Sequence, residues 1–127
     1  MKTLSALTMT TALLLSLGAC ATGPVPPPLS VSQPGPVTVA RGQALDIVLP
    51  MSAGTGYGWR LDREADPILD GGSSRVTSAD RPGGPVTTIY SYKAVARGKT
   101  TLSFTLKRPW DADKPDDRKA VFQVRVR

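Results

Sequence analysis

Hydrophobic and polar residues alternate with a period of two along most of the chain from residue 37 onward. Such alternation is typical of β-strands with one buried face and one solvated face. The inward-facing positions that it predicts are Val37 and Val39; Leu45, Ile47 and Leu49; Tyr57, Trp59 and Leu61; Thr88, Tyr90, Tyr92 and Ala94; Leu102, Phe104 and Leu106; and Phe122, Val124 and Val126. No stretch has the period of an amphipathic helix.

Turn residues separate these stretches at Arg41-Gly42, at residues 80–85 and at residues 96–99. Residues 62–72 are rich in Pro, Asp and Gly and predict a connection or a short edge strand, with a weak strand over 74–79. Six or seven strands with turns every eight to twelve residues predict an all-β, immunoglobulin-like β-sandwich of six to eight strands. The chain has one cysteine, so this sandwich contains no disulfide.

Three connections differ from ordinary turns, and we name them the first loop (residues 52–59), the second loop (residues 81–84) and the third loop (residues 108–119). The first loop reads SAGTGYGW and has glycine at every second position from 54 to 58. Glycine enters left-handed backbone regions without penalty and lets another chain approach closely. In a seven-strand sandwich, loops that follow alternate strands can meet at one end.

The N-terminus carries export signals. Residues 1–19 combine the positive Lys2 with a short apolar run and predict a signal peptide, because the run is too short to span a membrane. Leu17-Gly18-Ala19-Cys20 resembles a bacterial lipobox, which implies cleavage before Cys20 and lipid on its sulfur. The alternative is an ordinary signal cut near Ala21. Alanine after Cys20 further implies an outer-membrane lipoprotein that faces the periplasm.

Residues 20–36 contain six prolines and predict an extended spacer between the lipidated Cys20 and a domain that spans residues 37–127. A proline-rich segment of this kind cannot join the interior of a sheet. The alternative is an untethered, disordered terminus of the same composition.

Composition excludes several functions. The chain has no histidine, and its only cysteine is Cys20, so Ser–His, Cys–His and His-ligated metal sites are impossible. We expect no cofactor and no enzymatic activity, although a hydrolase with paired carboxylates stays open as the weakest class. The net charge of +6 comes from scattered Lys and Arg without an aromatic stacking series, so we expect no nucleic-acid partner.

The three loops together resemble the chagasin-type inhibitors of cysteine peptidases. That family has an Asn-Pro-Thr-Thr-Gly-Tyr-x-Trp loop, a Gly-x-Gly-Gly loop and an Arg-Pro-Trp loop, in this order. The residues that match are Thr55, Gly56, Tyr57 and Trp59; Gly83 and Gly84; and Arg108, Pro109 and Trp110. The chain departs from the family at Ser52, Ala53 and Gly54, and at Arg81, which replaces the first glycine of the second motif.

The resemblance implies a monomeric, reversible inhibitor of papain-like cysteine peptidases whose first loop enters the catalytic cleft while the other two loops grip its walls. The expected contact residues are Gly54, Thr55, Gly56, Tyr57, Gly83, Gly84, Arg108, Pro109 and Trp110. The departures bear on strength and target choice. The alternative function is a lipid-anchored envelope module that binds another protein or a glycan through the same loops.

Some of these residues also have structural interpretations. We expect Trp59 in the core and Trp110 in contact with the partner. Tyr57 could equally seal the end of the sandwich. Arg108 could equally have a structural role, by stacking on Trp110 or pairing with Asp111 or Asp113, instead of contacting the partner.

Overall fold

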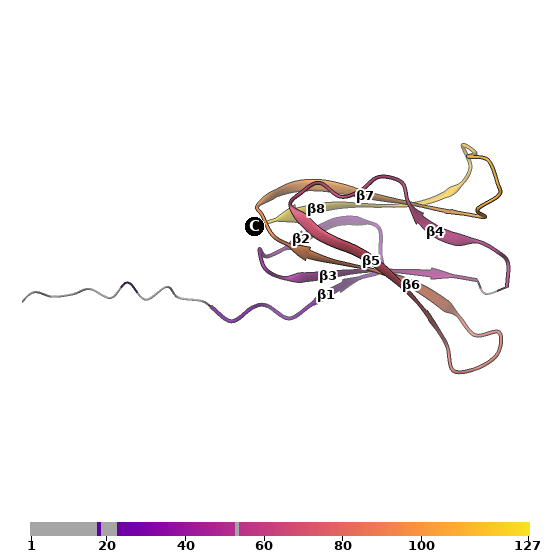
Figure 1. The fold of residues 1–127 in the computed structure, drawn as a ribbon, viewed down its shortest axis with the longest axis horizontal. Coiled ribbons are helices and arrows are strands. Elements are labelled where there is room, and N and C mark those ends of the chain that lie inside the picture. The colour runs from indigo at the N-terminus through magenta and orange to yellow at the C-terminus, as the bar shows by residue number, and fades with distance from the viewer. Residues whose placement is uncertain (1–17, 19–22, 53) are drawn as a thin grey trace, which may run out of the picture.

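The computed structural model describes residues 18, 23–52 and 54–127, and its regular secondary structure consists of eight β-strands. Cys20 and the signal segment other than Gly18 lie outside these residues. The strands form two four-stranded sheets that pack face to face (Figure 1). The all-β sandwich predicted from the alternation is confirmed.

The two sheets are each built from strands distant in sequence. In order across the first sheet, the strands are β1 (Leu29–Val31), β3 (Ala44–Met51), β6 (Val86–Ala94) and β5 (Leu69–Ser78). In order across the second, they are β2 (Gly35–Val39), β8 (Arg118–Val126), β7 (Gly98–Lys107) and β4 (Gly58–Leu61). Only the pairs β1–β3 and β2–β8 are parallel among the strands described. No helix in the described part of the chain is long and apolar enough to cross a membrane.

The core lies between the sheets and uses the predicted inward positions except Tyr57, which is exposed, and Leu61 and Leu106, which are only partly buried. Tyr90 and Phe104 have ring centroids 4.7 Å apart, and Phe104 meets Phe122 edge to face at 6.0 Å. Burial of each such side chain contributes roughly 1.5–3 kcal/mol. The buried hydrophobic residues all lie between Val37 and Val126 among those described, so residues 23–127 include the whole of this described core.

The predicted spacer ends earlier than Pro36. Residues 29–31 pair in parallel with β3, and β2 already begins at Gly35. Both strands lie at sheet edges, where proline is tolerated because one side of the strand needs no ladder donor. Gln43 Nε2 also donates a hydrogen bond to the carbonyl of Pro27 at 2.8 Å, so contact with the domain begins at Pro27.

Strand β5 is longer than the weak strand predicted over residues 74–79. It starts at Leu69, within the segment predicted as a connection or a short edge strand, and Gly71 and Gly72 form a bulge with positive φ values of 102° and 88°. A bulge of this kind lets the pairing with β6 continue on both sides.

The first, second and third loops lie at the same end of the sandwich, as their parity along the chain predicts (Figure 1). At the opposite end, the turns after β2 and β6 meet the end of β8. There the amide of Arg41 donates to the carbonyl of Arg127 at 2.9 Å, and the amide of Gly42 donates to the carbonyl of Ala94. We call this end the distal pole.

Candidate functional site

The first loop is fixed at its base by two hydrogen bonds. Trp59 is buried in the core, as predicted, and its Nε1 donates to the carbonyl of Pro50 at 3.0 Å. The buried hydroxyl of Tyr90 donates to the carbonyl of Trp59 at 2.9 Å. The first bond connects the end of β3 to the start of β4, and the second connects β6 to β4, so both ends of the loop are held by the sandwich.

The tip of the first loop has a backbone that glycine makes possible. Gly54 and Gly56 have φ values of 75° and 78°, in the left-handed region that disfavours other residues. Thr55 Oγ1 donates to the carbonyl of Ser52 at 3.1 Å and accepts from the amide of Tyr57 at 3.4 Å. The exposed Thr55 therefore orders the loop from within.

The third loop presents Trp110 to solvent. Its side chain is 71% exposed, and the guanidinium carbon of Arg108 lies 5.7 Å from its ring centroid. The same carbon lies 5.1 Å from the ring of Tyr57, which is 39% exposed and precedes β4 instead of joining the core face. Cation–π attraction favours this position of the guanidinium between two rings.

Arg108 both stacks on Trp110 and pairs with Asp111, the two structural interactions considered for it from the sequence. Its Nε donates to Asp111 Oδ2 at 2.9 Å. This hydrogen bond and the nearby carboxylate raise the pKa of Arg108 above its ordinary value. The guanidinium therefore stays charged beside the two aromatic rings.

The first and third loops are in direct contact. A Cβ atom added at Gly56 would lie 2.8 Å from Cη2 of Trp110 and 3.7 Å from Cδ of Arg108. The indole thus packs on backbone that only glycine leaves bare. We name Gly56, Tyr57, Arg108 and Trp110 the ridge, because two loops distant in sequence join there into one exposed feature.

Two cations brace the third loop through Asp113, an interaction that the sequence analysis missed. Lys107, whose side chain is only 6% exposed, donates through Nζ to Asp113 Oδ1. Arg60 Nη2 on β4 lies 3.2 Å from the same oxygen. The sequence does place Lys107 at the end of a strand and Asp113 six residues later. Because the third loop contains several other charged residues, this spacing does not single out the pair.

Asp113→Asn is expected to lower the Tm at neutral pH, because it leaves the buried Lys107 ammonium without its charged partner. The hydrogen bond from Lys107 holds the pKa of Asp113 below 3.8. The contribution of the carboxylate is therefore present above that pH and is lost as the pH falls through the lowered value. Thermal unfolding is expected to show a difference from wild type that closes in acid.

The matched control is Asp116→Asn, since Asp116 is exposed and takes part in no hydrogen bond or ion pair of the described residues. Equal loss of Tm in both variants would contradict a specific role for Asp113.

The second loop is a tight turn in which the two predicted contact residues, Gly83 and Gly84, differ in exposure. Gly83 is exposed with φ of 72°, whereas Gly84 is buried and donates its amide to the carbonyl of Arg81 at 3.1 Å. A Cβ at Gly84 would lie 2.6 Å from that of Ala79. The hydrogen bonds and ion pairs of the described residues connect this loop to neither of the other two.

The carboxylates beside the strands have structural partners. Asp62 accepts hydrogen bonds from Ser103 and Thr105 at 2.8 and 2.7 Å, and Asp66 accepts from Thr100 at 2.7 Å. No group of three His, Cys, Asp or Glu residues within the described ranges could hold a metal ion. These contacts give the carboxylates the role of tying the 62–68 connection to β7.

Three solved structures are similar in fold. The cysteine protease inhibitor EhICP2 from Entamoeba histolytica superposes with a TM-score of 0.70 at 20% identity, over 83% of this chain and 100% of its own. The solution structure of amebosin matches with a TM-score of 0.56 at 23% identity, over 83% and 100%. PbICP-C, solved in complex with falcipain-2, matches with a TM-score of 0.56 at 21% identity, over 83% and 95%.

The family comparison extends over almost the whole sandwich. A search of curated protein sequences found no match. The family model described as Chagasin family peptidase inhibitor I42 matches residues 38–126. The family and the similar structure EhICP2 are described as protease inhibitors and not as enzymes. This agrees with the absence of histidine from the sequence. The chain with this ridge and this sandwich belongs to the chagasin family of peptidase inhibitors.

Proposed function

We propose that this protein reversibly inhibits papain-like cysteine peptidases by placing the first loop in the catalytic cleft, with the second and third loops against the cleft walls. The observation that carries the proposal is the packing of Trp110 on Gly56. This contact makes one exposed ridge from the two loops that match the family's first and third motifs. PbICP-C, a structural neighbour, was solved bound to the peptidase falcipain-2.

The ridge suits insertion into a narrow cleft. The tip of the first loop at Gly54 and Gly56 has no side chain that a cleft wall would meet. Trp110 is held by Arg108 and by the backbone of Gly56 before any partner arrives. Such preorganisation lowers the entropy cost of binding, and interface tryptophans are frequent hot spots.

The first loop also resists becoming a substrate. Peptidases cut chains in an extended conformation, whereas Gly54 and Gly56 have φ values of 75° and 78°. The hydrogen bonds of Trp59 to Pro50 and of Thr55 to Ser52 oppose extension of this segment. The domain is therefore expected to dissociate from the cleft without being cleaved.

Protection of the catalytic cysteine tests the placement of the loops. Papain is treated with a small alkylating reagent, and the rate of thiol modification is measured with and without the domain of residues 23–127. Slower alkylation in proportion to the bound fraction is expected if the first loop lies over the thiol. Unchanged alkylation in a complex that forms would favour an envelope module that binds elsewhere through the same loops.

We further propose that Cys20 carries lipid and anchors the domain in a bacterial envelope, at the outer membrane and facing the periplasm. The lipobox-like residues 17–20 support this proposal. Cys20→Ser is expected to move the protein from the membrane fraction to the soluble fraction and to leave inhibition by the domain unchanged. Continued membrane fractionation of that variant would contradict the lipid anchor.

A further inference from the structure

The distal pole carries a cluster of positive charge. Five exposed cationic side chains come from the turns after β2 and β6, the start of β7 and the end of β8: Arg41, Arg97, Lys99, Arg125 and Arg127. Lys99 pairs with Arg125 in the strand register, and the backbones of Arg41 and Arg127 are hydrogen-bonded. The ion pairs of the described residues include none of these five.

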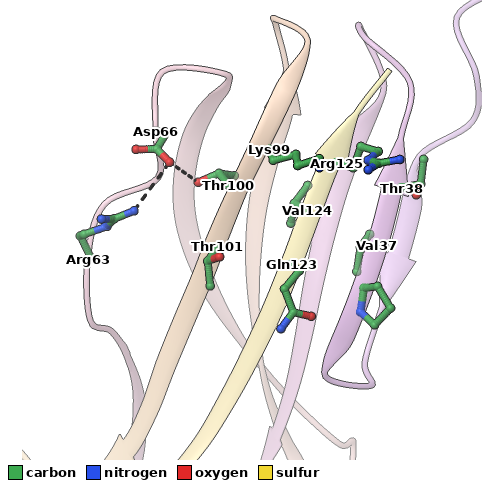
Figure 2. A pocket seen from close by; sticks show the side chains of 11 residues that line it. Val37, Thr38, Arg63, Asp66, Lys99, Thr100, Thr101, Gln123, Val124 and Arg125 are labelled. Atoms are coloured by element: carbon green, nitrogen blue, oxygen red, sulfur yellow. Dashed lines mark hydrogen bonds and ion pairs between the residues drawn. The ribbon is translucent and has the colours of Figure 1, made fainter.

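The second sheet adds a hollow beside this cluster. It has a volume of about 600 Å³ and lies on the outer face of β2, β8 and β7. Figure 2 shows Lys99, Arg125 and Thr38 near one end of it, with Thr101 and Gln123 further along the strands. Asp66, which also lines the hollow, is already bound by Arg63 and Thr100. The hollow therefore offers cations and neutral hydrogen-bonding groups to a phosphate-bearing ligand.

We propose that the distal pole docks on an anionic membrane, with lipid phosphates at the five cations and in the hollow. This surface lies opposite the ridge, so a membrane and a peptidase can be bound together (Figure 1). Five of the ten acidic residues lie at the other end, in or beside the second and third loops: Asp80, Asp111, Asp113, Asp116 and Asp117. Asp62, Glu64, Asp66 and Asp70 lie instead in or beside the 62–68 connection, where the carbonyl of Ile68 accepts from the amide of Val95 at the turn after β6. Asp62 and Asp66 are already held by hydroxyl groups of β7, whereas the five cations form no ion pair among the described residues and can face an anionic surface.

The path of the N-terminal segment supports a membrane as the occupant. Pro27 is hydrogen-bonded to Gln43, in the turn that also contains Arg41. Cys20 precedes Pro27 by seven residues, which span about 25 Å at most when fully extended. A lipid on Cys20 would therefore hold this pole, and not the loops, next to the bilayer. Docking through these charges requires neither the lipid nor the inhibitory activity.

Vesicle co-sedimentation of residues 23–127 without lipid tests the proposal. The domain is expected to bind phosphatidylglycerol-containing vesicles and not pure phosphatidylcholine vesicles, and added salt is expected to release it. Each Lys or Arg near an anionic surface strengthens binding roughly fivefold. Lys99→Glu with Arg125→Glu is therefore expected to weaken binding roughly thirtyfold or more.

The matched control reverses two cations at the other end, Lys114→Glu with Arg118→Glu, and is expected to retain most of the binding. If the Lys99 and Arg125 variant fails to fold by thermal unfolding, Arg41→Glu with Arg97→Glu replaces it, because both side chains lie in exposed turns. Equal losses of vesicle binding in both double variants would overturn the distal pole as the binding surface, because the net charge of the domain alone would then explain binding. Binding to a soluble polyanion such as heparin without binding to anionic vesicles would overturn the membrane as partner.

Discussion

Trp110→Ala is expected to weaken inhibition of a papain-like peptidase about tenfold or more while the fold is retained. The indole is 71% exposed, so its removal takes little from the core. It is also held in place by Arg108 and by the backbone of Gly56, so wild type loses little side-chain freedom on binding. The measurement is the inhibition constant for hydrolysis of a small fluorogenic peptide, with the Tm as a check on folding.

The control for the tryptophan variant is Val76→Ala. Val76 is also an exposed hydrophobic residue, at 60% exposure, but it lies on edge strand β5, outside the three loops. Its replacement is expected to leave the inhibition constant unchanged. An inhibition constant that Trp110→Ala does not alter would remove the third loop from the binding site.

Gly56→Ala is expected to weaken inhibition at least as much as Trp110→Ala. The new methyl group would lie 2.8 Å from Cη2 of Trp110, so the indole must leave its position. A φ of 78° also costs a non-glycine residue roughly 1–2 kcal/mol. Both effects change the ridge, whereas the buried core below Trp59 is untouched.

Gly54→Ala separates the two effects, because Gly54 has a similar φ of 75° but nothing within 4 Å of an added Cβ. It is expected to cost only the backbone strain, and so to weaken inhibition less than Gly56→Ala. In the double variant with Trp110→Ala, the loss caused by Gly56→Ala is expected to shrink, since the clash is gone. Fully additive losses would refute the packing of the indole on Gly56.

The alternation of residues predicts the sandwich because it reflects which face of each strand is buried. Leu45, Ile47 and Leu49 all lie in the core, as do Phe104 and Phe122. The pattern misses β1 because a strand of three residues between prolines is too short to show a period. It underestimates β5 because almost all of this edge strand is exposed, so both of its faces can be polar.

The candidate site is only partly predictable from the chain. The glycines of the first loop and the Arg108-Pro109-Trp110 motif are visible in the sequence and mark the two loops. Their contact is not visible, because it depends on how the third loop folds back across the end of the sandwich. The pairing of the buried Lys107 with Asp113 is hidden for the same reason, since it forms only when this loop takes its observed path.

The most direct test of the inhibitor function is a titration of papain with the domain of residues 23–127, following hydrolysis of a fluorogenic peptide. We expect loss of papain activity with a stoichiometry of one domain per peptidase, recovery of activity on dilution, and a domain that remains uncut. Full papain activity at micromolar domain, or cleavage of the first loop during the assay, would contradict the inhibitor function.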